Sequence, residues 1–189
     1  MNTHEQIISA PSEVNGIFPE DKSIIIIGMA AAGKSTMGRE LAKMLGWLFV
    51  DSDNLIESAY GTRLQNIADI LTKDEFLDME ATVIQRLRMQ RCVIATGGSV
   101  VYRPQAVEHL RTLGPLLHLD ASLEIVLERI ARKPDRGLAI APGQTVEDLY
   151  NERKLLYQQA EDLRVASGEK PCHFYAQLAI EELKKYFSA

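Results

Sequence analysis

An apolar run that leads into a glycine-rich loop constrains the fold of this chain more than any other feature. Residues 23–28 read SIIIIG, a β-branched run that is typical of a buried strand. Residues 28–35 read GMAAAGKS and match the pattern G-x-x-x-x-G-K-[ST]. A helical pattern follows over 34–45, and Gly46 stands where a helix C-terminal glycine belongs. Strand, loop and helix in this order predict an α/β fold organised around a phosphate site.

The loop residues are suited to holding a nucleotide. Small side chains let backbone N–H groups surround phosphate oxygens, and the following helix adds its positive end. We expect Lys34 to reach the β- and γ-phosphates and the Ser35 hydroxyl to bind Mg²⁺. ATP or GTP with Mg²⁺ is the predicted ligand, and the D-x-x-G and [NT]-K-x-D motifs of switch GTPases are missing. The predicted nucleotide-binding residues here are Gly28, Ala30, Ala31, Ala32, Gly33, Lys34, Ser35 and Thr36.

Strand-like and helical patterns alternate along the rest of the chain. Further strands are expected at 47–51, 92–98, 115–120 and 162–167, and helices at 74–90, 103–113, 122–132, 146–159 and 174–187. Thr72 is the expected N-cap of the 74–90 helix, with Glu75 completing a capping box. This alternation predicts α/β with a parallel sheet and one domain over 22–189. Residues 1–21 are expected to form a loosely held extension, either disordered or laid over a neighbouring surface.

Composition excludes several classes of protein. The net charge is −5, and acidic and basic residues are interleaved, which disfavours nucleic acid as a partner. No apolar run approaches the ~18 residues that cross a bilayer, and the N-terminus lacks the pattern of a signal peptide. Two cysteines without a C-x-x-C pair fit a reducing cytoplasm. We expect a cytoplasmic monomer or weak dimer that acts on a small molecule.

Polar residues follow the predicted strands, at the sheet edge where ligands bind. Asp51 and Asp53 come at the end of the second strand, where one carboxylate could hold Mg²⁺ and the other could accept a hydroxyl proton. Capping of the helix that starts near Asn54 is the alternative for both. A glycine pair, Gly97 and Gly98, allows a ligand close approach to the backbone, or simply forms a turn. The arginine-containing segment 132–146 suits a lid, or is a solvated loop.

In this order the motifs resemble those of the shikimate kinase family, from about residue 23 to 165. The resemblance rests on GMAAAGKST, FVDSDNLIE, GTRLQNIAD, FLDMEATVI, VIATGGSV, RGL and ERKLLYQQAED. It implies a three-layer P-loop kinase fold, with a five-stranded parallel sheet flanked by helices and a mobile lid. It also implies ATP-dependent phosphorylation of the 3-hydroxyl of shikimate.

The resemblance also implies roles for single residues. Lys34, Asp53 and the lid residue Arg136 would be catalytic, and Asp51 would organise Mg²⁺ together with Ser35. Arg129 would lie against adenine, and Arg153 would bind the substrate carboxylate. The substrate-binding residues would be Asp53, Glu80, Gly97, Gly98, Ser99 and Arg153.

Three positions depart from the family pattern. The family reads F-R-x-x-E where this chain has Phe76-Leu77-Asp78-Met79-Glu80, so an arginine that grips the carboxylate of shikimate is replaced by Leu77. Ser99 replaces a third glycine, and Gly137 replaces a lid proline. A lost charge-assisted hydrogen bond of about 1.5–3 kcal/mol weakens binding roughly ten- to a hundredfold.

These departures leave three hypotheses about the function open. The chain is a shikimate kinase with its second carboxylate contact elsewhere, at Arg63 or a lid arginine. It is a kinase of the same build for another alcohol, such as homoserine, with Arg153 on the carboxylate and Glu80 on the amine. Or it is a non-catalytic relative that binds nucleotide, which the intact phosphoryl-transfer residues disfavour.

Overall fold

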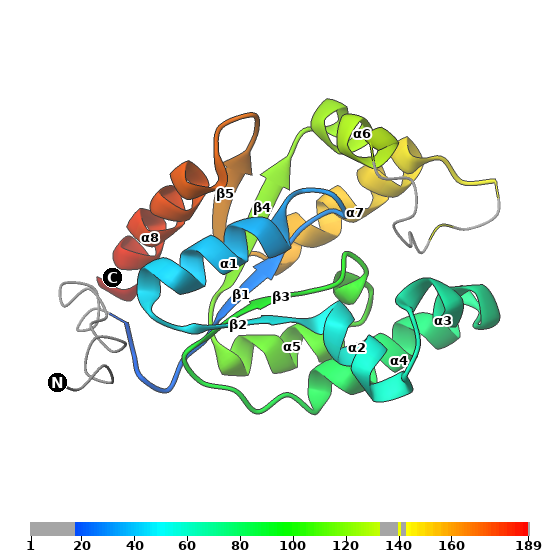
Figure 1. Cartoon of the computed structure of the whole chain (residues 1–189), viewed down its shortest axis with the longest axis horizontal. Helices are drawn as coiled ribbons and strands as arrows, with labels where there is room; N and C mark the ends of the chain where they lie inside the picture. Colours follow the sequence, from blue (N-terminus) through cyan, green and yellow to red (C-terminus); the bar gives the residue numbers. More distant parts are fainter. Residues whose placement is uncertain (1–17, 133–139, 141–142, 189) are drawn as a thin grey trace, which may run out of the picture.

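Five parallel strands form one sheet in the order β2-β3-β1-β4-β5 (Figure 1). The computed structural model describes residues 18–132, 140 and 143–188. The apolar run at the start of the chain becomes the central strand, where Ile25 pairs with Ile94 on one side and Leu116 on the other. The strands are β1 (Ile24–Ile27), β2 (Leu48–Asp51), β3 (Cys92–Ala95), β4 (Leu116–Ala121) and β5 (Leu163–Ser167).

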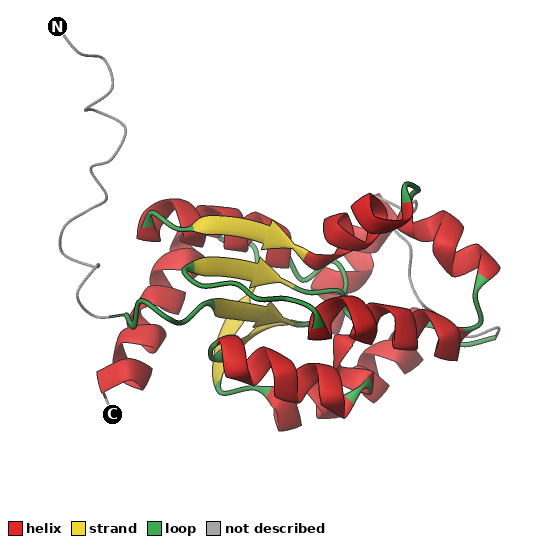
Figure 2. Ribbon diagram, turned by 90° about the horizontal axis from the view of Figure 1, so that it is seen from below, coloured by secondary structure: helices red, strands yellow, loops and turns green. Residues whose placement is uncertain are grey.

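Helices cover both faces of this sheet, and Figure 2 shows the strands between two helical layers. Successive side chains of a strand point to opposite faces. Ile24 and Ile26 accordingly join the core beneath α1 (Lys34–Leu45) and α8 (Cys172–Ser188). Ile25 and Ile27 join the core beneath α4 (Lys73–Gln85), α5 (Pro104–Leu113) and α7 (Val146–Ala160). The predicted three-layer α/β fold is confirmed.

A smaller cluster of helices lies at the carboxyl ends of the strands (Figure 1). The helices α2 (Ser52–Tyr60) and α3 (Leu64–Ile70) pack with the start of α4 around their own core of Ile56, Ile67, Phe76 and Met79. We call α2, α3 and the start of α4 the cap. A 3₁₀ turn, η1 (Val100–Tyr102), and helix α6 (Leu123–Arg132) complete the described elements.

Helix ends follow the signals in the sequence in most places. Gly46 ends α1 with a φ of 66°, in the left-handed region that favours glycine. The capping box at α4 is confirmed, because the Thr72 hydroxyl accepts from the Glu75 N–H and the Glu75 carboxylate accepts from the Thr72 N–H.

Some expectations about elements were wrong, and one helix was missed. The helix expected over 74–90 ends at Gln85, because the chain turns there to bury Leu87 in the core and Arg88 donates to the carbonyl oxygens of Gln85 and Leu87. Helix α3 was not predicted. Asp53 lies in the first turn of α2 and not at the end of the second strand, which stops at Asp51.

Packing of the N-terminal segment begins before residue 22. Phe18 is 6% exposed, and its ring meets Trp47 and Phe187 edge-on, with ring centroids 6.0 and 5.6 Å apart. The expected extension over 1–21 is thus packed from Phe18 onward, and residues 1–17 lie outside the described residues. Most of the predicted lid, including Arg136, also lies outside them. No described helix is long and apolar enough to cross a membrane.

Candidate active site

The phosphate loop joins β1 to α1 and depends on glycine at its first position. Gly28 has a φ of 142°, and a Cβ there would lie 2.6 Å from the carbonyl oxygen of Leu119, so a side chain is excluded. Lys34 is buried, and its Nζ donates to the carbonyl oxygens of Gly28 at 2.8 Å and Met29 at 2.9 Å. The lysine thus lies across the loop that is predicted to hold phosphate.

Ser35 and Asp51 meet beside this loop. The Ser35 hydroxyl donates to Asp51 Oδ2 at 2.7 Å, while Asp51 Oδ1 accepts from the Asp53 N–H at 3.1 Å and caps α2. Among the described residues no three His, Cys, Asp or Glu side chains cluster as a metal site. Mg²⁺ commonly uses one or two protein oxygens together with phosphate and water, and this hydroxyl–carboxylate pair fits that requirement. Asp51 caps α2 through Oδ1, so capping leaves Oδ2 as the oxygen that could bind a metal.

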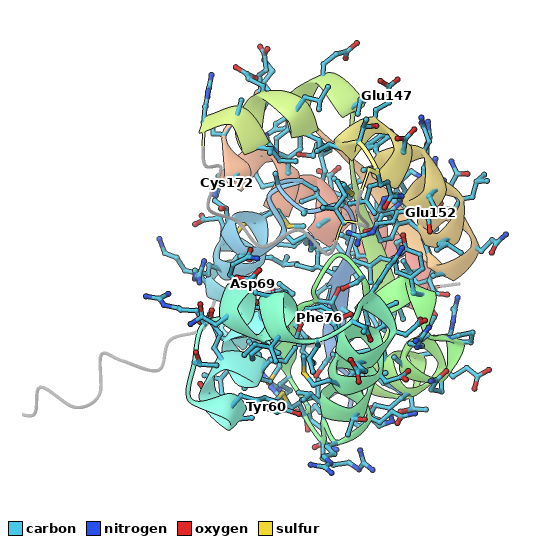
Figure 3. The ribbon with its side chains drawn as sticks, turned by 90° about the vertical axis from the view of Figure 1, so that its right-hand side faces the viewer. Tyr60, Asp69, Phe76, Glu147, Glu152 and Cys172 are labelled. Carbon is cyan, nitrogen blue, oxygen red and sulfur yellow. The ribbon has the colours of Figure 1, made fainter. Side chains whose placement is uncertain are left out.

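Two clefts open on either side of the phosphate loop. The larger, of about 610 Å³, is lined by the loop, the cap, the residues after β3 and Arg153. The smaller, of about 410 Å³, is lined by α6 residues, the loop after β5 and the start of α8. Ala31, Gly33 and Thr36 line both clefts. Figure 3 looks onto this end of the molecule, with Phe76 of the cap on one side and Cys172, which lines the smaller cleft, on the other.

Two carboxylates meet at Gly97 in the larger cleft. A Cβ on Gly97 would lie 2.0 Å from Glu80 Oε1 and 2.9 Å from Asp53 Oδ1, so only glycine leaves them room. Glu80 is 2% exposed. Its burial raises its pKa to about 7; nearby Asp53 adds to the rise, and a hydrogen bond with Ser99 opposes it together with the charges of Arg153 and Lys34.

Arg153 is held on α7 by aromatic neighbours. It is 2% exposed, its guanidinium lies 5.3 Å from the centroid of the Tyr102 ring, and its Nε donates to the Tyr102 hydroxyl at 3.4 Å. A Cβ on Gly98 would lie 3.0 Å from Nη1 of Arg153. The Tyr157 hydroxyl donates to the Gly98 carbonyl oxygen at 2.5 Å. Two tyrosines, from η1 and α7, therefore fix the arginine and the glycine turn together.

Leu77 lies in the protein interior. It is 2% exposed and is not among the described residues that line the larger cleft, whereas Phe76 and Glu80 on the same helix do line it. The larger cleft also contains Arg63, from the turn between α2 and α3.

Arg129 supports the phosphate loop from the smaller cleft. Its guanidinium donates to the carbonyl oxygens of Ala31 at 3.1 Å, Ala32 at 2.8 Å and Gly168 at 2.8 Å. It therefore joins the phosphate loop to the segment after β5. The expected contact with adenine remains a prediction, and its position in the smaller cleft is compatible with it.

The structure brings most of the predicted site residues to one end of the sheet, around two clefts. It also shows residues that sequence reasoning missed. Tyr102 lies outside the quoted motifs, and Tyr157 lies within ERKLLYQQAED but received no role there. Only the fold shows that they contact Arg153 and Gly98. Phe76 was noted as part of the FLDME stretch, but its place in the larger cleft becomes evident only from the fold.

The phosphate loop lies at the carboxyl end of a central parallel strand, with a hydroxyl–carboxylate pair beside it and a cleft on each side. This arrangement is that of a P-loop phosphotransferase. A family model described as shikimate kinase matches residues 30–184. The chain belongs to the shikimate kinase family and is an ATP-dependent small-molecule kinase.

Individual relatives agree with this assignment. The chain is 36% identical over 172 residues to a shikimate kinase of Rhodopseudomonas palustris, covering 89% of this chain and 84% of the relative. It is 37% identical over 166 residues to one of Pseudomonas paraeruginosa, covering 86% and 96%. The structure of a shikimate kinase from Acinetobacter baumannii in complex with shikimate matches with a TM-score of 0.80 at 28% identity, covering 87% of this chain and 94% of that one.

Proposed function

We propose that this protein transfers the γ-phosphoryl group of ATP to the 3-hydroxyl of shikimate. The observation that carries the proposal is a single cleft that contains the phosphate loop, Asp53 and the buried Arg153. These are the groups required to place a phosphoryl donor beside a hydroxylated carboxylic acid. Supporting it further, the closely similar structure from A. baumannii contains shikimate.

The nucleotide site follows from the residues around the loop. The nucleoside would occupy the smaller cleft beside Arg129, with its phosphates over Gly33 and Thr36, which face both clefts. Ser35 and Asp51 would hold Mg²⁺, which supplies charge neutralisation on the phosphates. The Lys34 ammonium would exchange its bonds with the loop carbonyls for bonds with phosphate oxygens.

The acceptor site uses the other wall of the cleft. Asp53 would accept the hydrogen bond of the reacting hydroxyl and orient its oxygen toward the phosphorus. Arg153 would bind the carboxylate, and Gly97 and Gly98 would let the ring approach the backbone. Arg136, in the lid outside the described residues, would neutralise charge on the transferred group. Positioning and charge neutralisation would supply most of the rate enhancement.

Glu80 and Leu77 favour one second candidate, an amino acid with a hydroxyl group, such as homoserine. A buried carboxylate in the cleft could bind an ammonium group while Arg153 binds the carboxylate. With Leu77 buried, no arginine on the adjacent turn of α4 offsets the charge of Glu80. An ammonium-bearing acceptor would make that charge favourable.

A coupled ADP-release assay separates the candidates. Shikimate, homoserine, gluconate and nucleoside monophosphates would be supplied in parallel with ATP and Mg²⁺, with Asp53→Asn as the control that lacks the proposed base. Saturation by shikimate at sub-millimolar concentration supports the main proposal. Saturation by homoserine alone supports the second candidate, and no turnover with any acceptor despite ADP binding supports a non-catalytic relative. We place the reaction in the cytoplasm, where ATP is available, and expect a monomer or weak dimer.

A further inference from the structure

The larger cleft contains more than one cation for its acceptor. Among the described residues that line it, the cationic side chains are Lys34, Arg63 and Arg153. Lys34 lies on the phosphate loop and is assigned to the nucleotide. Arg153 is buried against Tyr102 and is assigned to the acceptor carboxylate. Of these three cationic residues, only Arg63 has no role yet in binding either the nucleotide or the acceptor.

Arg63 is positioned by the turn that joins α2 and α3. It is the N-cap residue of α3, with extended backbone angles (φ −68°, ψ 144°), and its side chain is exposed at the cleft. Glu57, a neighbouring carboxylate on α2, accepts the Leu64 N–H at 2.9 Å and so caps α3. Within the described part of the chain, no carboxylate forms an ion pair with Arg63. Its guanidinium is therefore available to an anionic ligand.

We propose that Arg63 binds the carboxylate of the acceptor as the second cation of the site. The inference rests on the proposed function, because it requires an acceptor that carries a carboxylate. A guanidinium presents two parallel N–H donors that match the two oxygens of a carboxylate. The cation that α4 lacks at Leu77 is thus supplied from the cap, on a residue that belongs to a different helix.

The position of Arg63 explains why a buried leucine is tolerated at 77. Leu77 packs in the interior beside Phe76, and the cleft keeps its second positive charge through the turn before α3. The carboxylate of the acceptor would then be bound by two elements, α7 through Arg153 and the cap through Arg63. An acceptor that carries a carboxylate would bridge the cap and α7, whereas a neutral analogue would contact only one of them.

The test compares a charged acceptor with a neutral one. Steady-state KM values for shikimate, for its methyl ester and for ATP would be measured in the wild type, Arg63→Ala and Arg63→Lys. Arg86→Ala is the matched control, because Arg86 is an exposed arginine at the end of α4 that lines neither cleft. Shikimate binding in the presence of ADP and Mg²⁺ would be measured in parallel by calorimetry.

We expect Arg63→Ala to raise the KM and the Kd for shikimate about ten- to a hundredfold, with little change in the KM for ATP. Arg63→Lys should recover part of the loss, and the methyl ester should bind both variants and the wild type alike. An equal loss for acid and ester, a change in the KM for ATP instead, or no change at all would overturn the assignment of Arg63. If the wild type neither binds nor phosphorylates shikimate, the proposed function fails first, and the assignment fails with it for this acceptor.

Discussion

Leu77 and Ser99 both affect the same carboxylate, Glu80. Leu77 precedes Glu80 by three residues on α4, and residues at that spacing lie on one face of a helix. Ser99 hydrogen-bonds to Glu80 from the turn after β3. A hydroxyl therefore serves as partner where the family pattern has an arginine nearby. The two departures from that pattern are physically linked, since a neutral partner leaves the pKa of Glu80 high.

Replacing Leu77 with arginine should restore a cation beside Glu80. If Arg63 does not already supply the second cation, Leu77→Arg should lower the KM for shikimate about tenfold or more, the value of one charge-assisted hydrogen bond. If Arg63 does supply it, the gain should be small. The coupled assay measures it, with Leu77→Met as a control that keeps an apolar side chain. A higher KM would show that the acceptor side of the cleft has been rebuilt more extensively.

Glu80 should also make stability depend on pH. Its pKa is raised from 4.5 to about 7, so the folded state binds the proton more tightly than the unfolded chain. Its contribution to stability is therefore complete below pH 4.5 and is lost as the pH rises through about 7. The total loss is on the order of 3 kcal/mol.

Urea unfolding between pH 4.5 and 8.5 in the absence of ligands tests this. The unfolding free energy of the wild type should fall relative to that of Glu80→Gln across this range. Glu108 is an exposed glutamate on α5 and serves as the control. The unfolding free energy of Glu108→Gln should change with pH as that of the wild type does. Parallel curves for Glu80→Gln and the wild type would show that Glu80 stays ionised throughout.

At the level of elements, η1 and α7 together hold the acceptor wall. Tyr102 of η1 contacts Arg153 of α7, and Tyr157 of α7 holds the Gly98 carbonyl. Lys73, at the start of α4, reaches Glu152 of α7 at 3.9 Å and so joins the cap to the same wall. The position of Arg153 thus depends on η1, α7 and α4, which are distant from one another in sequence.

Removing the Tyr157 hydroxyl should affect the acceptor and not the nucleotide. In Tyr157→Phe the partly buried Gly98 carbonyl loses its donor, so we expect kcat/KM for the acceptor to fall about tenfold with the KM for ATP unchanged. Tyr150→Phe is the matched control, because Tyr150 lies on the same helix and donates to the Ala121 carbonyl at 2.9 Å. Equal kinetic losses in both variants would indicate a general effect on α7.

Local patterns predicted the elements that local chemistry determines. The isoleucine run gave β1, and the Thr72 capping box gave the start of α4, because both signals depend on neighbouring residues. Helix α3 was missed because its seven residues bury only Ile67. The contacts of Tyr102 and Tyr157 depend on which distant elements meet at the cleft, and a short motif contains no such information.

At the scale of the whole molecule, the two clefts beside the phosphate loop exist only in the folded chain. A nucleotide that binds there should therefore stabilise the folded state against unfolding. At a concentration one hundred times its Kd, Mg²⁺–ADP should add about 2.7 kcal/mol and raise Tm by roughly 5–10 °C. Ser35→Ala should lose the part of the shift that Mg²⁺ supplies, whereas Ser188→Ala, at the end of α8, should keep it. Thermal scans with and without EDTA measure both, and an equal shift in wild type with and without EDTA would contradict a metal role for Ser35.

The aromatic cluster of Phe18, Trp47 and Phe187 has a practical consequence for such experiments. Trp47 is the only tryptophan of the chain and directly precedes β2, at the amino end of a strand. Both clefts lie at the opposite, carboxyl end of the sheet. The tryptophan fluorescence of the protein should therefore report the separation of Phe18 and of α8 from Trp47, and it should change little when a ligand enters either cleft.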